Sequence, residues 1–296
     1  MKVIRPLDIT AAMVISSTAT PDPYPAYSTG GTYNLDERVV EDDAVWQCAD
    51  NGVTGIKPES GSTKWLRVGP VNRLAMIDNS VTTQTTGGAA LEVAIQPGAV
   101  FSSLALVNLD GTRAVIEITD GVGGPLVYSR NIDLDGTDIL DWYMYFFEPC
   151  DLLQDLYLTD LPPYETAVLK IRIEGTAGTA IGALVIGDIT ELGGTQYGIG
   201  VGVTDYSVKE EDQFGTSTLK EGAFAREMDP SIMVENSRLR LINTTLTRLR
   251  AKPTVWIASD DQDLSLLIVY GYPKRWRVEI PYPKHSLLRI EIRGMT

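Results

Sequence analysis

The sequence has few of the side chains that metal sites, disulfides and imidazole catalysis require. Its 296 residues include one histidine, His285, and two cysteines, Cys48 and Cys150. This shortage removes most ways of building a His/Cys metal site and excludes a disulfide framework. We expect both cysteines to be small buried hydrophobic residues in a protein made in the cytoplasm, and we predict neither a metal site nor a cofactor.

Basic residues are also scarce. The chain has 25 Lys and Arg against 39 Asp and Glu, a formal net charge of −14 at pH 7. Such a surface repels phosphate backbones, so we expect no nucleic acid partner. The last hundred residues, 197–296, hold 14 basic and 13 acidic residues, which leaves 11 and 26 for residues 1–196. The contrast favours a C-terminal part that docks onto something else, with chance composition as the alternative.

Long apolar runs are missing too. The longest, residues 177–189, is interrupted by three glycines and Asp188, and falls short of the roughly 18 residues that span a bilayer. Residues 1–17 contain only a brief apolar stretch, less than a signal peptide needs. We therefore expect no membrane insertion.

What is present predicts a mainly-β protein of several parts. Hydrophobic residues make up 44% of the chain, a globular composition, and the length suggests two or three domains. We predict an N-terminal arm and linker (1–25), ending in three prolines; a small aromatic β-module (26–70); a jelly-roll-like β-sandwich (71–195); and a C-terminal β-barrel-like assembly domain with one helix (196–296).

The sandwich prediction depends on period-two alternation. Residues 91–95, 115–119 and 168–174 alternate apolar and polar side chains, which indicates strands with one wet face. Turn residues separate them at the spacing of an all-β sandwich. The aromatic run Trp142–Phe147 is expected to be a central strand that fills the core.

The C-terminal part predicts a long hairpin, one helix and closing strands. Residues 201–228 are expected to form the hairpin, bending at 212–215. The helix is expected to begin with Asp229 as N-cap and Pro230 in its first turn, and to end before Pro253. The expected closing strands are 255–258, 266–272, 277–280 and 287–292.

One motif has the spacing of a calcium loop. Asn131, Asp133 and Asp135 alternate and are followed by Gly136, as in an EF-hand. The twelfth position is Trp142 and not the bidentate Glu that completes the calcium shell, and strands are expected on both sides. An acidic hairpin turn is the favoured interpretation.

The other chemical motifs also favour structural roles. The glycines of residues 198–202 precede a strand-like segment and not the helix of a phosphate loop. Acidic runs at 210–212 and 260–263 fall at expected turns, whereas a glycosidase needs two carboxyl groups held across a cleft. His285 is the only possible imidazole base, and the sequence has no Gly-x-Ser-x-Gly motif whose serine it could activate. We predict no catalytic residues and no enzymatic activity, with a glycan-degrading enzyme as an alternative.

The aromatic residues of the small module are the candidate binding residues. Tyr27, Tyr33, Trp46 and Trp65 are flat rings of the kind that stack on sugar faces, and this needs no ionisable group. The alternative is that a module of this size needs these rings as its core.

The same segment resembles the short chitin-binding-type carbohydrate-binding modules. Their usual run is Thr-Tyr-x-x-Gly-Asp-x-Val followed by an aromatic residue and a Trp. In this chain Asp36-Glu37 replaces the Gly-Asp pair, and Trp46 replaces the usual Tyr. The carrying residues are Thr32-Tyr33-x-x-Asp36-x-Arg38-Val39-Val40, Trp46, Asn51-Gly52-x-Thr54-Gly55-x-x-Pro58 and Trp65-Leu66.

Over nearly its full length the chain is similar to virion proteins of tailed bacteriophages and prophages, often labelled tail or carbohydrate-binding. The expected order of hairpin, helix and closing strands also looks like the domain of tail-tube and distal-tail proteins, which form rings. The carrying segments are Gly69-Pro70-x-Asn72-Arg73-x-Ala75-Met76, Leu106-Val107-Asn108-Leu109-Asp110-Gly111, Trp142-Tyr143-x-Tyr145-Phe146-Phe147-Glu148-Pro149, Leu158-Thr159-Asp160-Leu161-Pro162-Pro163-Tyr164, Ile181-Gly182-x-Leu184-Val185-Ile186-Gly187, Gly193-Gly194-Thr195-Gln196-Tyr197-Gly198, and Leu267-Ile268-Val269-Tyr270-Gly271 to His285.

This resemblance implies a structural component of a phage tail, at the tip, the baseplate or the fibre attachment, that links the tail to host-recognition parts. Its expected location is the virion, and its expected partners are other copies of itself in a ring, other tail proteins and a host surface glycan. The alternative from another class is a carbohydrate-binding protein of the virion that recognises the host through Tyr27, Tyr33, Trp46 and Trp65.

Overall fold

The protein is built mainly from β-strands, as predicted. The computed structural model describes residues 1–137, 141–147, 152–211, 215, 217–259 and 266–295. Strands make up 51% of the chain and helices 10%, which confirms the mainly-β fold class.

One large sheet extends through the sandwich and the C-terminal part. Its strands are β1 (Lys2–Pro6), β8 (Thr85–Gly87), β10 (Ser103–Asp110), β13 (Leu156–Leu158), β15 (Thr179–Glu191), β16 (Gly194–Thr195), β17 (Gly200–Asp205), β20 (Phe224–Asp229), β21 (Ser231–Glu235), β22 (Thr254–Ile257), β23 (Ile268–Glu279) and β24 (His285–Gly294). The hydrogen-bonded order is β13-β10-β15-β1-β22-β23-β24-β20-β17, and β8 pairs with β15, β21 with β24, and β16 with β21.

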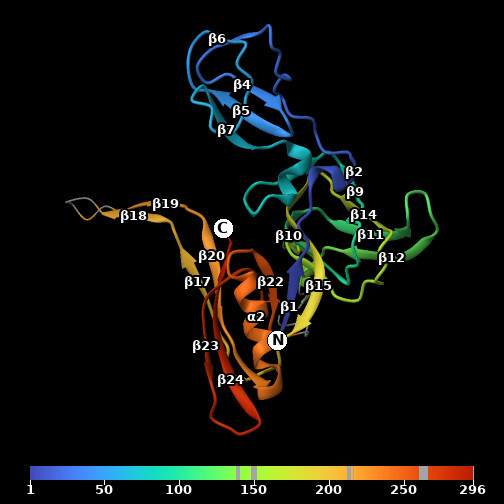
Figure 1. The fold of residues 1–296 in the computed structure, drawn as a ribbon, viewed down its shortest axis with the longest axis vertical. Coiled ribbons are helices and arrows are strands. Elements are labelled where there is room, and N and C mark those ends of the chain that lie inside the picture. The colour runs from blue at the N-terminus through green and yellow to red at the C-terminus, as the bar shows by residue number, and fades with distance from the viewer. Residues whose placement is uncertain (138–140, 148–151, 212–214, 216, 260–265, 296) are drawn as a thin grey trace.

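The central strand of this sheet comes from the N-terminus. Residues 1–25, expected as an arm and linker, place β1 between β15 and β22, where Ile4 faces Ile189 on one side and Val255 on the other. The large sheet therefore crosses the predicted boundary at residues 195/196, and the two parts share one backbone hydrogen-bond network (Figure 1). The three prolines do fall in a segment without regular structure, between β2 (Val14–Ser17) and the small module.

A five-stranded sheet covers one half of the large sheet and completes the sandwich. It consists of β2, β9 (Ala90–Ile95), β11 (Arg113–Asp120), β12 (Leu126–Asp133) and β14 (Ala167–Glu174), in the order β12-β11-β14-β9-β2. The alternation expected in residues 91–95, 115–119 and 168–174 is confirmed, because every second side chain enters the core. Ile116 and Ile171 from this sheet join Leu106 and Ile186 from the large sheet in that core.

A helix covers the other half of the same face. The helix α2 (Leu239–Leu249) follows the 3-10 turn η3 (Asn236–Arg238) and buries Ile242, Leu246 and Leu249 against strands of the large sheet. Its N-terminus was expected at Asp229 and Pro230, and this was wrong. Residues 231–235 form β21 instead, because alternate side chains Ile232 and Val234 enter the core while their neighbours face outward.

The opposite face of the large sheet curls around a third core. Ile4, Val185, Val255 and Tyr270 meet there, and burial raises the pKa of Tyr270 to about 12. Strands near the two ends of the sheet approach each other at this curl, since Arg226 of β20 forms an ion pair with Asp155, just before β13, at an N–O distance of 2.9 Å. The result is a half-barrel, consistent with the barrel-like prediction.

The small module folds on its own core. Its strands are β3 (Thr32–Tyr33), β4 (Arg38–Glu41), β5 (Ala44–Cys48), β6 (Val53–Thr54) and β7 (Trp65–Pro70), paired as β4-β5-β7 and β3-β6. Figure 1 shows it at the end of the molecule farthest from the β23–β24 turn. The 3-10 helices η1 (Ala11–Met13) and η2 (Asn72–Ile77) lie in the segments before and after it.

The aromatic run expected as a core strand is a short exposed helix. Residues Trp142–Phe147 form α1, in which Trp142, Tyr143 and Phe146 are exposed. The prediction was wrong because aromatic residues favour strands only through packing, and Trp142, Tyr143 and Phe146 are largely exposed. The expected strands 266–272 and 277–280 are also corrected, because they are one strand, β23, with an irregularity after Pro273.

We expect the central position of β1 to make its side chains essential for stability. Ile4→Ala removes a fully buried side chain, and the free energy of unfolding of the variant should be lower by about 2–5 kcal/mol in urea denaturation. The matched control, Ile15→Ala, alters a residue of edge strand β2 that is 44% exposed and should change stability by about 0.5 kcal/mol or less. Equal effects of the two variants would contradict a central role for β1.

Candidate functional site

The structure brings the four predicted binding aromatics together, but two of them lie in the core. Trp46 on β5 is 5% exposed and Trp65 on β7 is 4% exposed. Their indole N–H groups donate to backbone carbonyls, Trp46 to Glu41 at 3.1 Å and Trp65 to Ile56 at 2.8 Å. Neither indole presents an open ring face to a sugar, so the alternative role as module core applies to both.

The two tyrosines are half-buried beside Trp65. The ring centroids of Tyr27 and Tyr33 are 5.5 Å apart in a stacked arrangement, and Tyr33 meets Trp65 edge-on at 5.3 Å. The Tyr33 hydroxyl accepts a hydrogen bond from the Ser28 N–H at 2.7 Å and donates to the Ser28 carbonyl at 3.2 Å. These contacts fix both rings in the module, and sugar binding by the two tyrosines stays a prediction.

The calcium-like motif does not form a cation cage. The Arg113 Nε–H donates to Asn131 Oδ1 at 2.5 Å, and Asp133 lies 4.0 Å from the same guanidinium. Asp135 accepts the Thr137 N–H instead, and hydrogen bonds from Thr137 lower the pKa of Asp135. The oxygens thus have protein partners in different directions. Within the described residues, no three His, Cys, Asp or Glu side chains are placed to hold a metal ion.

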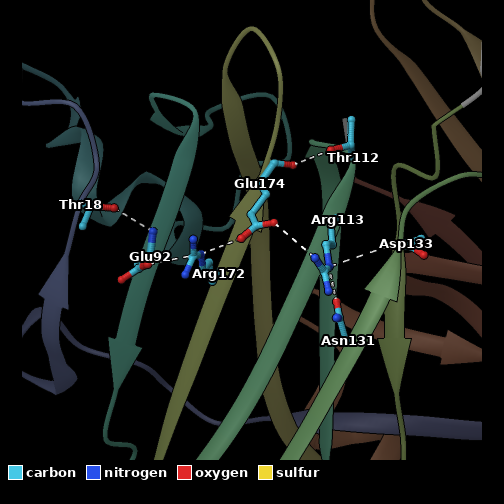
Figure 2. Close-up of polar contacts among 8 residues, drawn as sticks. All are labelled: Thr18, Glu92, Thr112, Arg113, Asn131, Asp133, Arg172 and Glu174. Carbon is cyan, nitrogen blue, oxygen red and sulfur yellow. Dashed lines mark hydrogen bonds and ion pairs between the residues drawn. The ribbon is translucent and has the colours of Figure 1, made fainter.

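Asn131 and Asp133 belong to a charge ladder on the outer face of the five-stranded sheet. Figure 2 shows the ladder crossing β9, β14, β11 and β12. Arg172 contacts Glu92 at 3.4 Å and Glu174 at 2.9 Å, and Glu174 continues to Arg113 at 3.9 Å. Such exposed pairs contribute little stability each. Because acids and arginines alternate across the strands, this face offers no uncompensated block of charge to a ligand.

The remaining sequence motifs, where they are described, lie on strands or lead into them. Glu210 and Glu211 lie on the exposed strand β18 (Val208–Glu211), and His285 begins β24 opposite Glu235. His285 also lines a surface hollow of about 540 Å³ whose lining residues include no Ser, Thr, Tyr or Cys nucleophile. The glycines of residues 198–202 lead into β17 and not into a helix. Asp212, Asp260, Asp261, Asp263 and Cys150 lie outside the described residues.

The surface that stands out is a β-hairpin that projects from the large sheet. The predicted pairing of the hairpin strands is confirmed, since residues 200–205 of β17 pair with residues 224–229 of β20, and β18 pairs with β19 (Ser217–Lys220) farther out. Residues 212–214 of the expected bend lie outside the described residues. Every described residue of β18 and β19 is exposed, and Figure 1 shows this tip extending away from the body of the molecule. The exposed apolar side chains along the hairpin are Val203, Tyr206, Val208, Leu219 and Phe224.

An aspartate turn sets the direction of this hairpin. Asp205, at the end of β17, accepts the Ser207 N–H at 2.9 Å and pairs with Lys209 at 3.2 Å. These hydrogen bonds, with that of Ser207 first, lower the pKa of Asp205 to about 2. Because the folded-state pKa lies below the ordinary value near 3.8, the turn is fully stabilised above pH 4 and loses this contribution as pH falls toward 2.

Two surfaces were missed by sequence reasoning. They are the exposed aromatic helix α1 and the outer face of α2, which carries Arg240 and Arg248. The signal for the second was present in the sequence, because no acidic residue occurs from 236 to 259. Among the described helices, none has the length and apolar character needed to cross a bilayer.

We expect truncation of the indoles to unfold the small module. Trp46→Ala and Trp65→Ala each remove a buried ring and should lower the stability of the module by about 3–5 kcal/mol, measured by thermal denaturation followed by near-ultraviolet circular dichroism. Leu66→Ala, at an exposed neighbouring position, is the control and should leave the transition in place. An unaltered transition in the tryptophan variants, with loss of glycan binding, would instead support a stacking role.

Comparison of the chain with protein-family models, with curated proteins and with solved structures finds no match to any of them.

Proposed function

We propose that this protein is a structural component of a bacteriophage tail, at the tip, baseplate or fibre attachment, and that it assembles with copies of itself through its C-terminal part. The observation that carries the proposal is the projecting hairpin of residues 200–229, whose tip strands β18 and β19 are exposed and, in the described chain, pair only with each other. The tail setting is the one that the resemblance of the sequence implies.

The hairpin supports assembly on energetic grounds. A two-stranded hairpin alone in water is marginally stable, so one that extends beyond its sheet gains from packing against a partner. Its exposed side chains include Leu219, which is 70% exposed, and Phe224. Surfaces of this kind mark interaction sites, and open strand edges add unpaired N–H and C=O groups that another chain can bond.

The geometry also favours a ring over a simple pair. We propose that each hairpin contacts the body of the next copy without a reciprocal contact, which makes the interface heterologous. A heterologous contact forms a closed ring when its rotation closes. In such a ring the small module extends away from the hairpin contact, because Figure 1 places the module and the hairpin tip on different sides of the molecule.

The proposal needs no catalytic group. Its expected location is the virion, and its expected partners besides other copies are neighbouring tail proteins. We keep recognition of a host glycan as a proposed function of the small module, through Tyr27 and Tyr33 alone, because the indoles of Trp46 and Trp65 are buried.

We expect shortening of the hairpin to abolish assembly without unfolding the chain. Deleting residues 208–220 joins Ser207 to Glu221 and keeps the ladder between β17 and β20. Sedimentation equilibrium should show oligomers for the wild type and a monomer for the deletion, with unchanged far-ultraviolet circular dichroism.

A point variant separates apolar contact from hairpin length. Leu219→Asp should weaken assembly at least tenfold, since it places a charge in the contact, whereas the same change at the exposed Leu66 of the small module should have no effect. A wild-type chain that stays monomeric at all concentrations and never enters phage particles would overturn the proposed function.

A further inference from the structure

The outer face of α2 carries positive charge in an otherwise acidic chain. Residues 236–259 contain no acidic residue and five basic ones, Arg238, Arg240, Arg248, Arg250 and Lys252. The helix buries Ile242, Leu246 and Leu249, so the opposite side faces water. We call this side the arginine face, and define it as Arg240, Leu241, Thr244, Thr247 and Arg248.

Charges near the arginine face are only partly neutralised by the chain itself. Lys252 pairs with Asp8 at 2.7 Å, and Arg238 donates to the Glu191 carbonyl at 2.9 Å. In the part of the chain that the structure describes, Arg240 and Arg248 have no acidic partner. Two guanidinium groups about two turns apart on one helix are therefore available to an acidic surface.

The surface between the two arginines is apolar. Thr244 and Thr247 donate their hydroxyl hydrogens to the carbonyls of Arg240 and Asn243, at 2.9 and 2.8 Å. This leaves their methyl groups as outward hydrophobic contacts beside Leu241, which is 59% exposed. A partner that suits this face must bring carboxylates together with apolar or aromatic side chains.

The same chain holds a surface of that composition. Residues 131–169 contain nine acidic residues and no Lys or Arg, and three of these acids, Asp133, Asp155 and Asp160, pair with arginines of other segments. Within them, α1 exposes Trp142, Tyr143 and Phe146, and the rings of Trp142 and Phe146 are stacked with centroids 6.2 Å apart. Asp135 and Asp141 precede this helix and are exposed. We call α1 with these two aspartates the acidic aromatic segment.

We propose that the arginine face of one copy binds the acidic aromatic segment of a second copy. Guanidinium groups pair with carboxylates and also stack over Trp and Phe rings, so one arginine can satisfy both features of the segment. The proposal deepens the proposed function, on whose self-association it rests, by naming a second contact besides the hairpin.

A second copy fits better than another acidic partner such as nucleic acid. The chain outside the arginine face is strongly acidic, with 26 acidic and 11 basic residues in 1–196, and would repel a phosphate backbone at close range. A second copy instead supplies acidic residues and apolar rings in one segment, next to the matching cations and methyl groups.

The test is a charge reversal with a reciprocal rescue. Arg240→Glu with Arg248→Glu should raise the dissociation constant of the assembly about 10- to 100-fold by sedimentation equilibrium, and should reduce its dependence on salt. Asp135→Arg with Asp141→Arg should weaken assembly similarly. Mixing the two double variants should restore it, because each then supplies the charge that the other lacks.

Matched controls isolate the contact from net charge. Arg67→Glu with Lys170→Glu makes the same change in net charge at exposed sites outside both surfaces, and should leave assembly near the wild-type level. Trp142→Ala with Phe146→Ala should weaken assembly at high salt, where charge pairing is screened. Circular dichroism confirms that each variant is folded.

The outcomes distinguish the two proposals. A wild type that never assembles overturns the proposed function and this contact together. A wild type that assembles, with the reversal no weaker than the control, overturns this contact alone. Loss of assembly in both double variants without rescue on mixing also overturns it, because the arginines then bind some other acidic surface.

Discussion

The architecture depends on the backbone pairing of β1 with β15 and β22. These few residues close the gap between a sandwich made from residues 85–191 and a C-terminal part made from residues 194–294, and both contacts join positions far apart in the chain. Without β1, β15 and β22 would each present an open edge. With it, the projecting hairpin, α2 and the sandwich hold fixed positions, which an assembly through several surfaces requires.

The sequence predicted the strands that have one face in water, and it missed β1 and β21, whose structure depends on pairing with distant parts of the chain. β9, β11 and β14 alternate because water lies on one side. β1 lacks this signal, since Val3 and Ile4 are buried on opposite faces, under different cores. Asp229 and Pro230 have the composition of a helix start but occupy a corner between β20 and β21, because the alternation of residues 231–235 is satisfied by pairing with β24. In β1 and in residues 231–235, contacts with residues distant in the sequence determine the secondary structure.

The candidate site was predicted only in part, because tertiary contacts also determine which aromatic rings are buried. Composition identified the aromatic residues of the small module, but could not tell which rings lie inside. A module with so few residues needs Trp46 and Trp65 for its core, and their N–H groups reach backbone carbonyls without leaving it. In α1 the reverse occurred, because Trp142, Tyr143 and Phe146, which were expected in the core, are exposed. The hairpin was predictable because its strands are adjacent in sequence and need no distant partner.

Charge pairing distinguishes the outer face of the five-stranded sheet from the outer face of α2. On the five-stranded sheet, acids and arginines alternate between neighbouring strands, so Arg113 and Arg172 are satisfied where they stand and the face stays compatible with water. On α2 the basic residues are concentrated in one helix whose own turns contain no acid, and local pairing at i and i+4 cannot occur. Residues 1–196 carry the excess acid, and the chain itself pairs only part of the basic charge around α2, as in the ion pair of Lys252 with Asp8. Because β1 joins the two parts through one network of backbone hydrogen bonds, the arginines of α2 and the acidic N-terminal part hold fixed positions relative to each other.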